Sequence, residues 1–151
     1  MPKVVIADTS CLIVLSNIEQ LQILRQLYGN IVTTPDVERE YGDTLPDWVE
    51  IISPKDKTRQ VLLELQLDKG ESSAIALALE IPDCVLIIDD YKARKIAEQL
   101  ELKITGTLGI LLKAKQRGLL KSIMPIVKKL KLTGFRISDE LENDIKLLSD
   151  E

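Results

Sequence analysis

The most constraining feature of this sequence is a set of short apolar runs that end in aspartate. Asp8 follows the apolar run 4–7, and Asp89 and Asp90 follow the run 85–88. Runs of about four residues rich in Val and Ile are typical of buried strands. Because ligands bind at the carboxyl ends of strands in open parallel sheets, we expect these acids to share one pocket. Such a pocket suits Mg²⁺ or Mn²⁺, which prefer oxygen ligands.

Short apolar runs alternate with helical patterns along the whole chain. We expect strands over 4–7, 31–33, 49–52, 85–88 and 102–105. We expect helices over 11–17, 21–28, 35–41 and 56–67, helices beginning at 71, 89–90 and 106–107, and helices over 121–131 and 138–149. This alternation predicts an α/β fold with a parallel sheet covered by helices on both faces. With 151 residues and no internal repeat or linker, residues 1–151 are expected to form one domain.

The composition excludes several kinds of chemistry. The chain has no His, so it cannot carry a Ser-His-Asp triad, a Cys-His nucleophile or a His-ligated zinc ion. Its two cysteines, Cys11 and Cys84, lie in apolar surroundings without CxxC spacing, which favours buried, reduced thiols. No apolar stretch reaches the roughly 18 residues of a membrane span, and no secretory signal is recognisable. We therefore expect a cytoplasmic protein that does not enter a membrane.

The net charge of −4 hides a strong asymmetry along the chain. Residues 102–138 contain nine Lys and Arg residues and no acid. Such a segment can contact phosphates, although solvated lysines on helix faces are an equally good explanation. The candidate nucleic-acid surface comprises Lys113, Lys115, Arg117 and Lys121. The acidic segment 139–151 leaves open whether a terminal helix covers this surface.

Two further carboxylates stand at suggestive places. Glu40 lies in a short predicted helix after the second strand, and Glu71 follows Gly70 at a helix start. A carboxylate at a helix start is by itself more often a cap than a ligand. Asp8 is the exception, because Thr9 and Ser10 are available to cap the helix that follows.

Five pieces of the sequence, taken in order, resemble the PIN domain, the metal-dependent nuclease fold of VapC-type toxins and several RNA-processing enzymes. They span about residues 4–118, and the last three resemble an uncharacterised bacterial and archaeal branch of the family. The pieces are Ile6-Ala7-Asp8-Thr9-Ser10, Pro35-x-Val37-x-x-Glu40, Gly70-Glu71-x-x-Ala74-Ile75-x-Leu77-Ala78, Leu86-Ile87-Ile88-Asp89-Asp90-x-x-Ala93-Arg94 and Gly106-Thr107-Leu108-Gly109.

The resemblance implies a three-layer α/β/α fold with a five-stranded parallel sheet in the order 3-2-1-4-5. The core would cover 4–118, with a C-terminal helical extension over 119–151. Strands one and four would then be central neighbours, as the acid-terminated runs suggest independently. The implied metal and catalytic residues are Asp8, Glu40, Glu71 and one or both of Asp89 and Asp90.

The resemblance also implies phosphodiester hydrolysis, because one or two divalent ions can activate water and neutralise a phosphate. Thr9, Ser10 and Thr107 are candidates for positioning water or phosphate, although capping is the simpler role. Arg94 lies one helical turn after Asp90, and we expect it to pair with Asp90 in preference to contacting phosphate.

The sequence therefore predicts a Mg²⁺- or Mn²⁺-dependent endoribonuclease, the toxin component of a type II toxin–antitoxin pair. Its expected partners are RNA, a cognate antitoxin and a second copy in a homodimer. The alternative is a catalytically weak PIN-like protein that binds RNA or a protein partner. A haloacid-dehalogenase-like phosphatase fits poorly, because that family needs a second Asp where this chain has Ser10. A receiver domain also fits poorly, because its paired acids follow the first strand.

Overall fold

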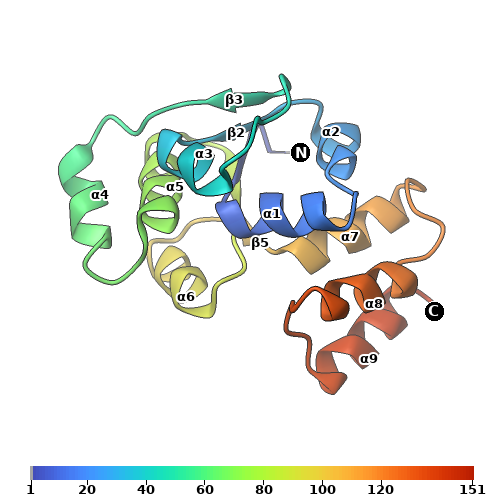
Figure 1. Ribbon diagram of the computed structural model, residues 1–151. Coiled ribbons are helices and arrows are strands. Elements are labelled where there is room, and N and C mark those ends of the chain that lie inside the picture. The colour runs from blue at the N-terminus through green and yellow to red at the C-terminus, as the bar shows by residue number, and fades with distance from the viewer. Residues whose placement is uncertain (1) are drawn as a thin grey trace.

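Figure 1 shows the computed structural model, which describes residues 2–151, so that residue 1 of the expected domain lies outside the described part. A five-stranded parallel sheet in the order β3-β2-β1-β4-β5 forms its centre, which confirms the expected α/β fold and strand order. The strands are β1 (Val4–Ala7), β2 (Ile31–Thr33), β3 (Val49–Ile51), β4 (Cys84–Ile87) and β5 (Ile104–Thr105). Ala7 pairs with Ile87, so β1 and β4 end at the same edge of the sheet.

Helices cover both faces of this sheet (Figure 1). Val5 and Ala7 face a core shared with α1, α2 and α7, whereas Ile6 faces α5 and α6. Because successive strand residues point to opposite faces, a strand buried on both sides must be apolar throughout, as β1 is. The helices are α1 (Thr9–Asn17), α2 (Gln22–Tyr28), α3 (Pro35–Tyr41), α4 (Lys57–Leu63), α5 (Lys69–Glu80), α6 (Tyr91–Gln99), α7 (Thr107–Gln116), α8 (Met124–Leu132) and α9 (Asp139–Leu148).

Several element boundaries differ from the sequence-based expectation. The helix expected over 56–67 ends at Leu63, because the N–H groups of Leu65 and Gln66 donate to carbonyls three residues earlier and tighten the chain into turns. The helix expected from 121 begins at Met124, with Pro125 in its first turn, where a missing N–H is tolerated. The strand expected over 102–105 is only two residues long.

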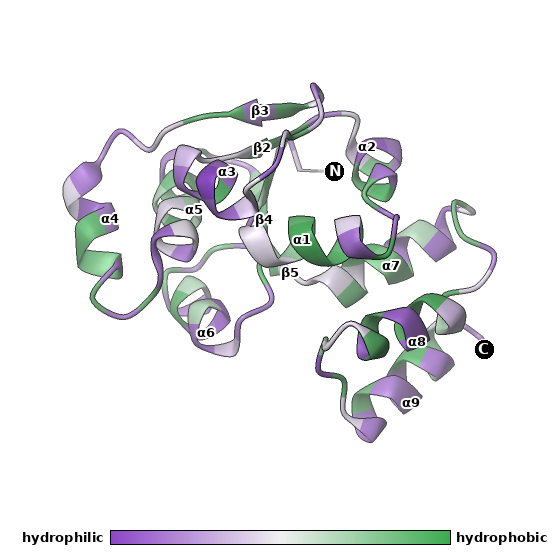
Figure 2. Cartoon of the chain, viewed as in Figure 1, coloured by the Kyte–Doolittle hydropathy of each residue, from purple (hydrophilic) through white to green (hydrophobic). Residues whose placement is uncertain are grey.

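The helices α8 and α9 form a C-terminal hairpin beside α7 (Figure 1). Ile123, Val127 and Leu130, together with Ile145 of α9, belong to the same buried cluster as α1 and α7. Figure 2 shows the corresponding alternation of hydrophobic and hydrophilic residues along both helices of the hairpin. The hairpin therefore extends the core on the α1 and α7 side of the sheet.

Both cysteines are buried and free, as expected. Over residues 2–151, none of the helices has the length and apolar character needed to span a bilayer.

Candidate active site

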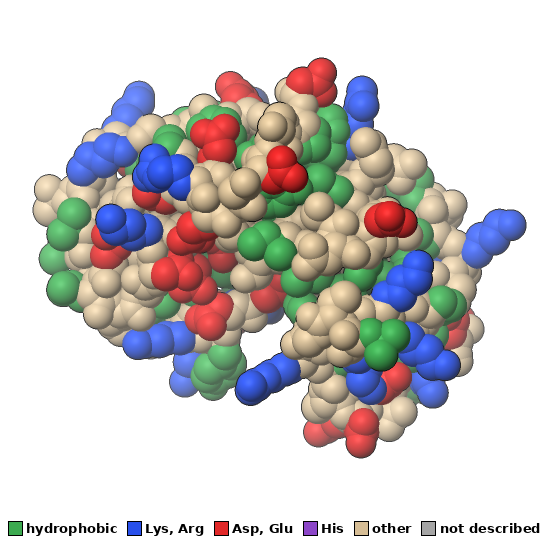
Figure 3. Space-filling model, viewed as in Figure 1, with side chains coloured by type: hydrophobic (Ala, Val, Ile, Leu, Met, Phe, Trp, Pro, Cys, Tyr) green, Lys and Arg blue, Asp and Glu red, His purple; other side chains and the backbone are tan. Residues whose placement is uncertain are grey.

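Acidic side chains gather where β1 and β4 end. The N–H of Asp8 donates to the carbonyl of Ile87 at 3.1 Å, which holds the end of β1 against β4. Figure 3 shows acidic side chains clustered on the face formed by α3, α5 and α6. Asp8, which follows β1, therefore lies at the same edge of the sheet as Asp89 and Asp90, which follow β4.

Asp8 is the most unusual of these acids. It is only 2% exposed, and its buried Oδ1 atom has no hydrogen-bond partner among residues 2–151. Burial raises the pKa of Asp8 to about 7, and the negative charges of Glu71 and Asp68 add to the rise. A buried oxygen that lacks a donor is costly and calls for an explanation beyond folding.

The region around Asp8 also corrects one expectation. Asp8 itself occupies the N-cap position of α1, and its side chain makes no capping hydrogen bond. Thr9 does not cap the helix, because its hydroxyl donates to Oε1 of Glu40 at 2.6 Å. Ser10 is an exposed residue of α1.

Glu40 projects from α3 and is held from two sides. Its Oε1 atom accepts from Thr9, and its Oε2 atom accepts from the N–H of Gly70 at 3.1 Å. A Cβ atom at position 70 would lie 2.1 Å from Oε1 of Glu40, so only glycine allows this approach. Gly70 thus positions Glu40 beside the first turn of α5.

Glu71 lies in the same turn of α5 and forms a capping box with Asp68. The N–H of Glu71 donates to Asp68 at 2.7 Å, and the N–H of Asp68 donates to Oε1 of Glu71 at 3.3 Å. Burial raises the pKa of Glu71 to about 7, and the negative charges of Asp68 and Asp90 add to the rise. Sequence reasoning missed Asp68, although the Asp-x-x-Glu spacing before the apolar residues of α5 is the signal that could have found it.

The two neighbouring aspartates at the end of β4 take different roles. Both carboxylate oxygens of Asp89 accept from Thr107, one from its N–H at 2.8 Å and the other from its hydroxyl at 2.6 Å. Asp90 caps α6 through the N–H of Ala93 at 3.0 Å. Asp89 therefore anchors the start of α7, whereas Asp90 contributes its charge to the side where Glu71 lies.

Most of the residues that the sequence suggested for positioning water or phosphate already form hydrogen bonds within the protein. Thr107 is bound to Asp89. The guanidinium of Arg94 donates to the carbonyl of Ile88 at 2.9 Å, and among residues 2–151 no ion pair joins it to Asp90, so that expectation was wrong. Asp90 instead accepts from the N–H of Ala93 in the first turn of its own helix, while Arg94 donates to the Ile88 carbonyl.

Comparison with known families places this chain. A family model described as "DUF3368: PIN domain" matches residues 4–151, which is nearly the whole sequence. The chain belongs to the PIN domain family. No curated protein matches it. PIN domains are generally nucleases that use divalent metals, which agrees with the acidic edge of this sheet.

The carboxylates of this PIN domain suit an oxygen-ligated cation. All the candidate donors are carboxylates, Asp8 has an oxygen without a partner, and two of the acids have a pKa raised to about 7. A hard divalent cation relieves both the repulsion and the missing hydrogen bond. Within the described residues, however, no three acid or cysteine side chains converge closely enough to hold a metal ion, because Glu40, Glu71 and Asp90 are drawn to nearby N–H or hydroxyl groups.

The basic residues of the candidate nucleic-acid surface differ in their contacts in this PIN domain. Lys115 is held by the carbonyl of Ser149 and by Glu151, with 2.9 Å separating its Nζ from Oε2 of Glu151. The acidic C-terminal segment therefore covers this one lysine. Lys113 lies 5.4 Å from the centre of the Tyr28 ring, and Arg117 and Lys121 are exposed.

Proposed function

We propose that this PIN domain is a Mg²⁺- or Mn²⁺-dependent endoribonuclease that hydrolyses RNA phosphodiester bonds. The single observation that carries the proposal is Asp8, a buried carboxylate with an unpartnered oxygen at the carboxyl end of the central strand. Folding alone gives no reason to place an acid there. A cation-binding role does.

The proposed metal-binding residues are Asp8, Glu40, Glu71 and Asp90. Asp89 is the less favourable candidate, because the charge that helps to raise the pKa of Glu71 is that of Asp90, whereas the oxygens of Asp89 accept from Thr107. When bound, a divalent cation would lower the pKa of its coordinated water and neutralise charge on the attacked phosphate. Asp8 and Glu71 stay partly protonated near neutral pH without a cation, so cation binding is expected to release protons.

The chain's own residues support this site in two further ways. Thr9 and Gly70 fix both oxygens of Glu40, so its charge stays beside the start of α5. The basic side chains Lys113, Arg117 and Lys121 on and after α7 offer contacts for RNA phosphates. Ser10, which is exposed on α1 next to Asp8 in the chain, remains the candidate for positioning water or phosphate.

The finer form of the proposal is a cytoplasmic toxin that pairs with an antitoxin and forms a homodimer. Its support is an exposed apolar surface on and after α4, comprising Val61, Leu62 and Leu65, of which Leu65 is 79% exposed. Exposed apolar patches mark interaction surfaces. An antitoxin gene beside this one, and co-purification of its product, would test that role.

The decisive experiment is cleavage of a mixed pool of structured and single-stranded RNA with Mn²⁺, Mg²⁺ or EDTA. We expect Asp8→Asn to lower metal-dependent cleavage by at least about a hundredfold, because even residues that only orient ligands contribute up to that much. The matched control is Asp47→Asn, the same change at an exposed loop position. Equal cleavage by the two variants would contradict the proposal.

One observation favours the alternative of a PIN domain that binds RNA or a protein partner without cutting. Among residues 2–151, the acids do not converge as a ready metal site. Under this alternative the folded wild type would cleave no RNA with either metal, and Mn²⁺ would leave its melting temperature unchanged.

A further inference from the structure

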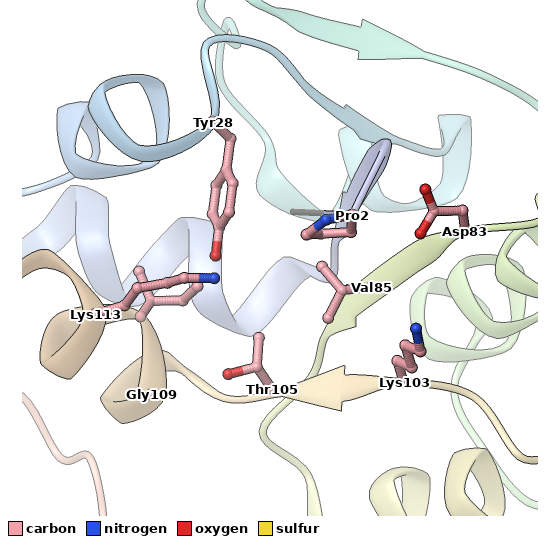
Figure 4. A pocket seen from close by; sticks show the side chains of 9 residues that line it. Pro2, Tyr28, Asp83, Val85, Lys103, Thr105, Gly109 and Lys113 are labelled. Carbon is pink, nitrogen blue, oxygen red and sulfur yellow. The ribbon is translucent and has the colours of Figure 1, made fainter. Parts of the chain in front are cut away.

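Two hollows lie side by side along the β5 edge of the sheet. The first, of about 330 Å³, is lined by Tyr28 and Lys113 and opens between α2 and α7 (Figure 4). The second, of about 410 Å³, is lined by Asp89 and by Phe135 and Arg136 of the C-terminal hairpin. Both are lined by Thr105 and Gly109. We call the two together the edge groove.

The two hollows of the edge groove adjoin at the short β5 strand and at one glycine. β5 has only two residues, and within residues 2–151 no strand pairs with its outer edge. A Cβ atom at Gly109 would lie 2.5 Å from the Thr105 hydroxyl, so a larger residue would push that hydroxyl out of place. The two hollows therefore adjoin at Thr105 and Gly109, which line both of them.

Positive charge lines the edge groove. Arg94 and Arg136 line one hollow, and Lys103 and Lys113 line the other. Within the described residues neither Arg136 nor Lys103 forms an ion pair. Free cations beside an acidic catalytic edge favour a negatively charged ligand that extends away from it.

The two acids that line the edge groove are both engaged. The Asp83 carboxylate accepts from the N–H of Lys3, and the Asp89 carboxylate accepts from Thr107. The negative charges of these two acids reduce the positive potential locally. Because their oxygens already accept hydrogen bonds, they compete less for the basic side chains.

Aromatic rings are the second observation that points to a ligand. The whole chain has five aromatic residues, and one of them lines each hollow. Figure 4 shows the Tyr28 side chain pointing into the first hollow, toward Lys113 and Thr105. Alternating rings and cations are what a single strand of nucleic acid requires, because bases stack on rings while phosphates contact Lys and Arg.

We propose that single-stranded RNA lies along the edge groove, with bases against Phe135 and Tyr28 and phosphates beside Arg136 and Lys113. This path rests on the proposed ribonuclease function, because Asp89, which lines one of the hollows, directly precedes Asp90 of the acidic site in the chain. The C-terminal hairpin, which lies outside the acidic edge, thereby contributes to substrate binding. An acidic peptide would satisfy the cations but has no use for the ring faces.

The test is binding of a fluorescein-labelled 12-nucleotide single-stranded RNA, followed by anisotropy in EDTA so that no cleavage occurs. The groove variant is Lys113→Gln with Arg136→Gln, and its matched control is Lys128→Gln with Lys129→Gln on α8, which line neither hollow. We expect the groove variant to lose about tenfold in affinity and the slope of log affinity against log salt to fall by roughly 1.4. The control is expected to change less than about twofold.

A second variant isolates the base contact. Phe135→Leu keeps an apolar side chain for packing and removes the ring face, and we expect a loss of about fivefold in affinity. Melting temperatures of all variants check the fold. A loss in the charge variant with none in Phe135→Leu would indicate a purely electrostatic surface, suited to an acidic peptide, and would overturn the proposal.

The failure of this path and the failure of the ribonuclease proposal are distinguishable. If the wild type cleaves RNA but the groove and control variants bind it equally, the path is overturned and the activity stands. If groove variants lose RNA affinity but no metal supports cleavage, the activity is overturned and the groove stands. No RNA binding by the folded wild type in EDTA would overturn the path directly.

Discussion

Two carboxylates of this protein both lose solvation, but their pKa values shift in opposite directions. Asp8 is buried at the end of β1 with an oxygen lacking a partner, and burial raises its pKa to about 7. Glu151, beside α8, also loses solvation, but donors from the backbone of Ile123 and from Ser122 and Lys115 outweigh that loss and lower its pKa to about 2. A carboxylate that accepts several hydrogen bonds stabilises the folded structure, whereas a carboxylate with an unpartnered oxygen is left to interact with a bound ligand.

The largest expected effect is on the stability of the metal-free protein at different pH values. The folded protein raises the pKa of Asp8 from 3.8 to about 7. Its ionisation therefore destabilises the fold progressively as the pH rises from about 4 to about 7. Asp8→Asn removes this penalty, which corresponds to about 4 kcal/mol at full ionisation.

Urea unfolding of wild type and Asp8→Asn in EDTA from pH 5 to pH 8 measures this effect. The stability advantage of the variant should grow with pH and level off above about 7. Asp47→Asn serves as the control and should differ from wild type by the same amount at every pH. An advantage of Asp8→Asn that stays constant with pH would show that Asp8 is not held in the environment described here.

The second expected effect is stabilisation by metal. At a Mn²⁺ concentration a hundred times the dissociation constant, binding to the folded state alone adds about 2.7 kcal/mol. We expect Mn²⁺ to raise the melting temperature of the wild type and of Glu151→Gln, but not of Asp8→Asn, with EDTA reversing the rise. Equal rises in all three proteins would place the bound metal elsewhere.

The third expected effect concerns the position of Glu40. Gly70→Ala inserts a Cβ atom 2.1 Å from Oε1 of Glu40 and must displace that side chain. Since misplacing a catalytic group by about 1 Å can lower a rate up to a hundredfold, we expect cleavage to fall by about tenfold or more. Lys69→Ala, an exposed change in the same helical turn, is the control for an effect of the helix itself.

The smallest expected effect is at Glu151, and its pH dependence has the opposite sign. A lowered pKa stabilises the fold above the ordinary value of 4.5, and this contribution is lost as the pH falls toward about 2. Glu151→Gln should lower the melting temperature by about 3 °C at pH 7 and by less in acid. RNA cleavage should be unchanged. A loss of cleavage without a loss of stability would link the C-terminal segment to the active site.

The sequence by itself determined the architecture of the sheet and the identity of its acids. Apolar runs such as 4–7 and 85–88 are buried on both faces of the sheet. Burial on both faces requires apolar residues throughout the run, so such strands can be predicted from the local sequence. The strand order followed from the resemblance of five pieces of the sequence to the PIN domain, and the order and the family membership are both confirmed. Asp8 was also identifiable, because no local capping role accounts for it.

The tertiary structure alone decided how neighbouring residues divide their tasks. Asp89 and Asp90 are adjacent in the chain, yet Asp89 binds Thr107 of α7 and Asp90 caps α6. The partner of Asp89 is distant in the sequence, whereas the partner of Asp90 lies in the first turn of the helix that it caps. Thr9 was expected as a local cap, and Gly70 only as the residue before Glu71 at a helix start, but both bind Glu40. The reason is physical: hydrophobic period is set by nearest neighbours in the chain, whereas the partners of Asp89 and Glu40 come from elements that only folding brings together.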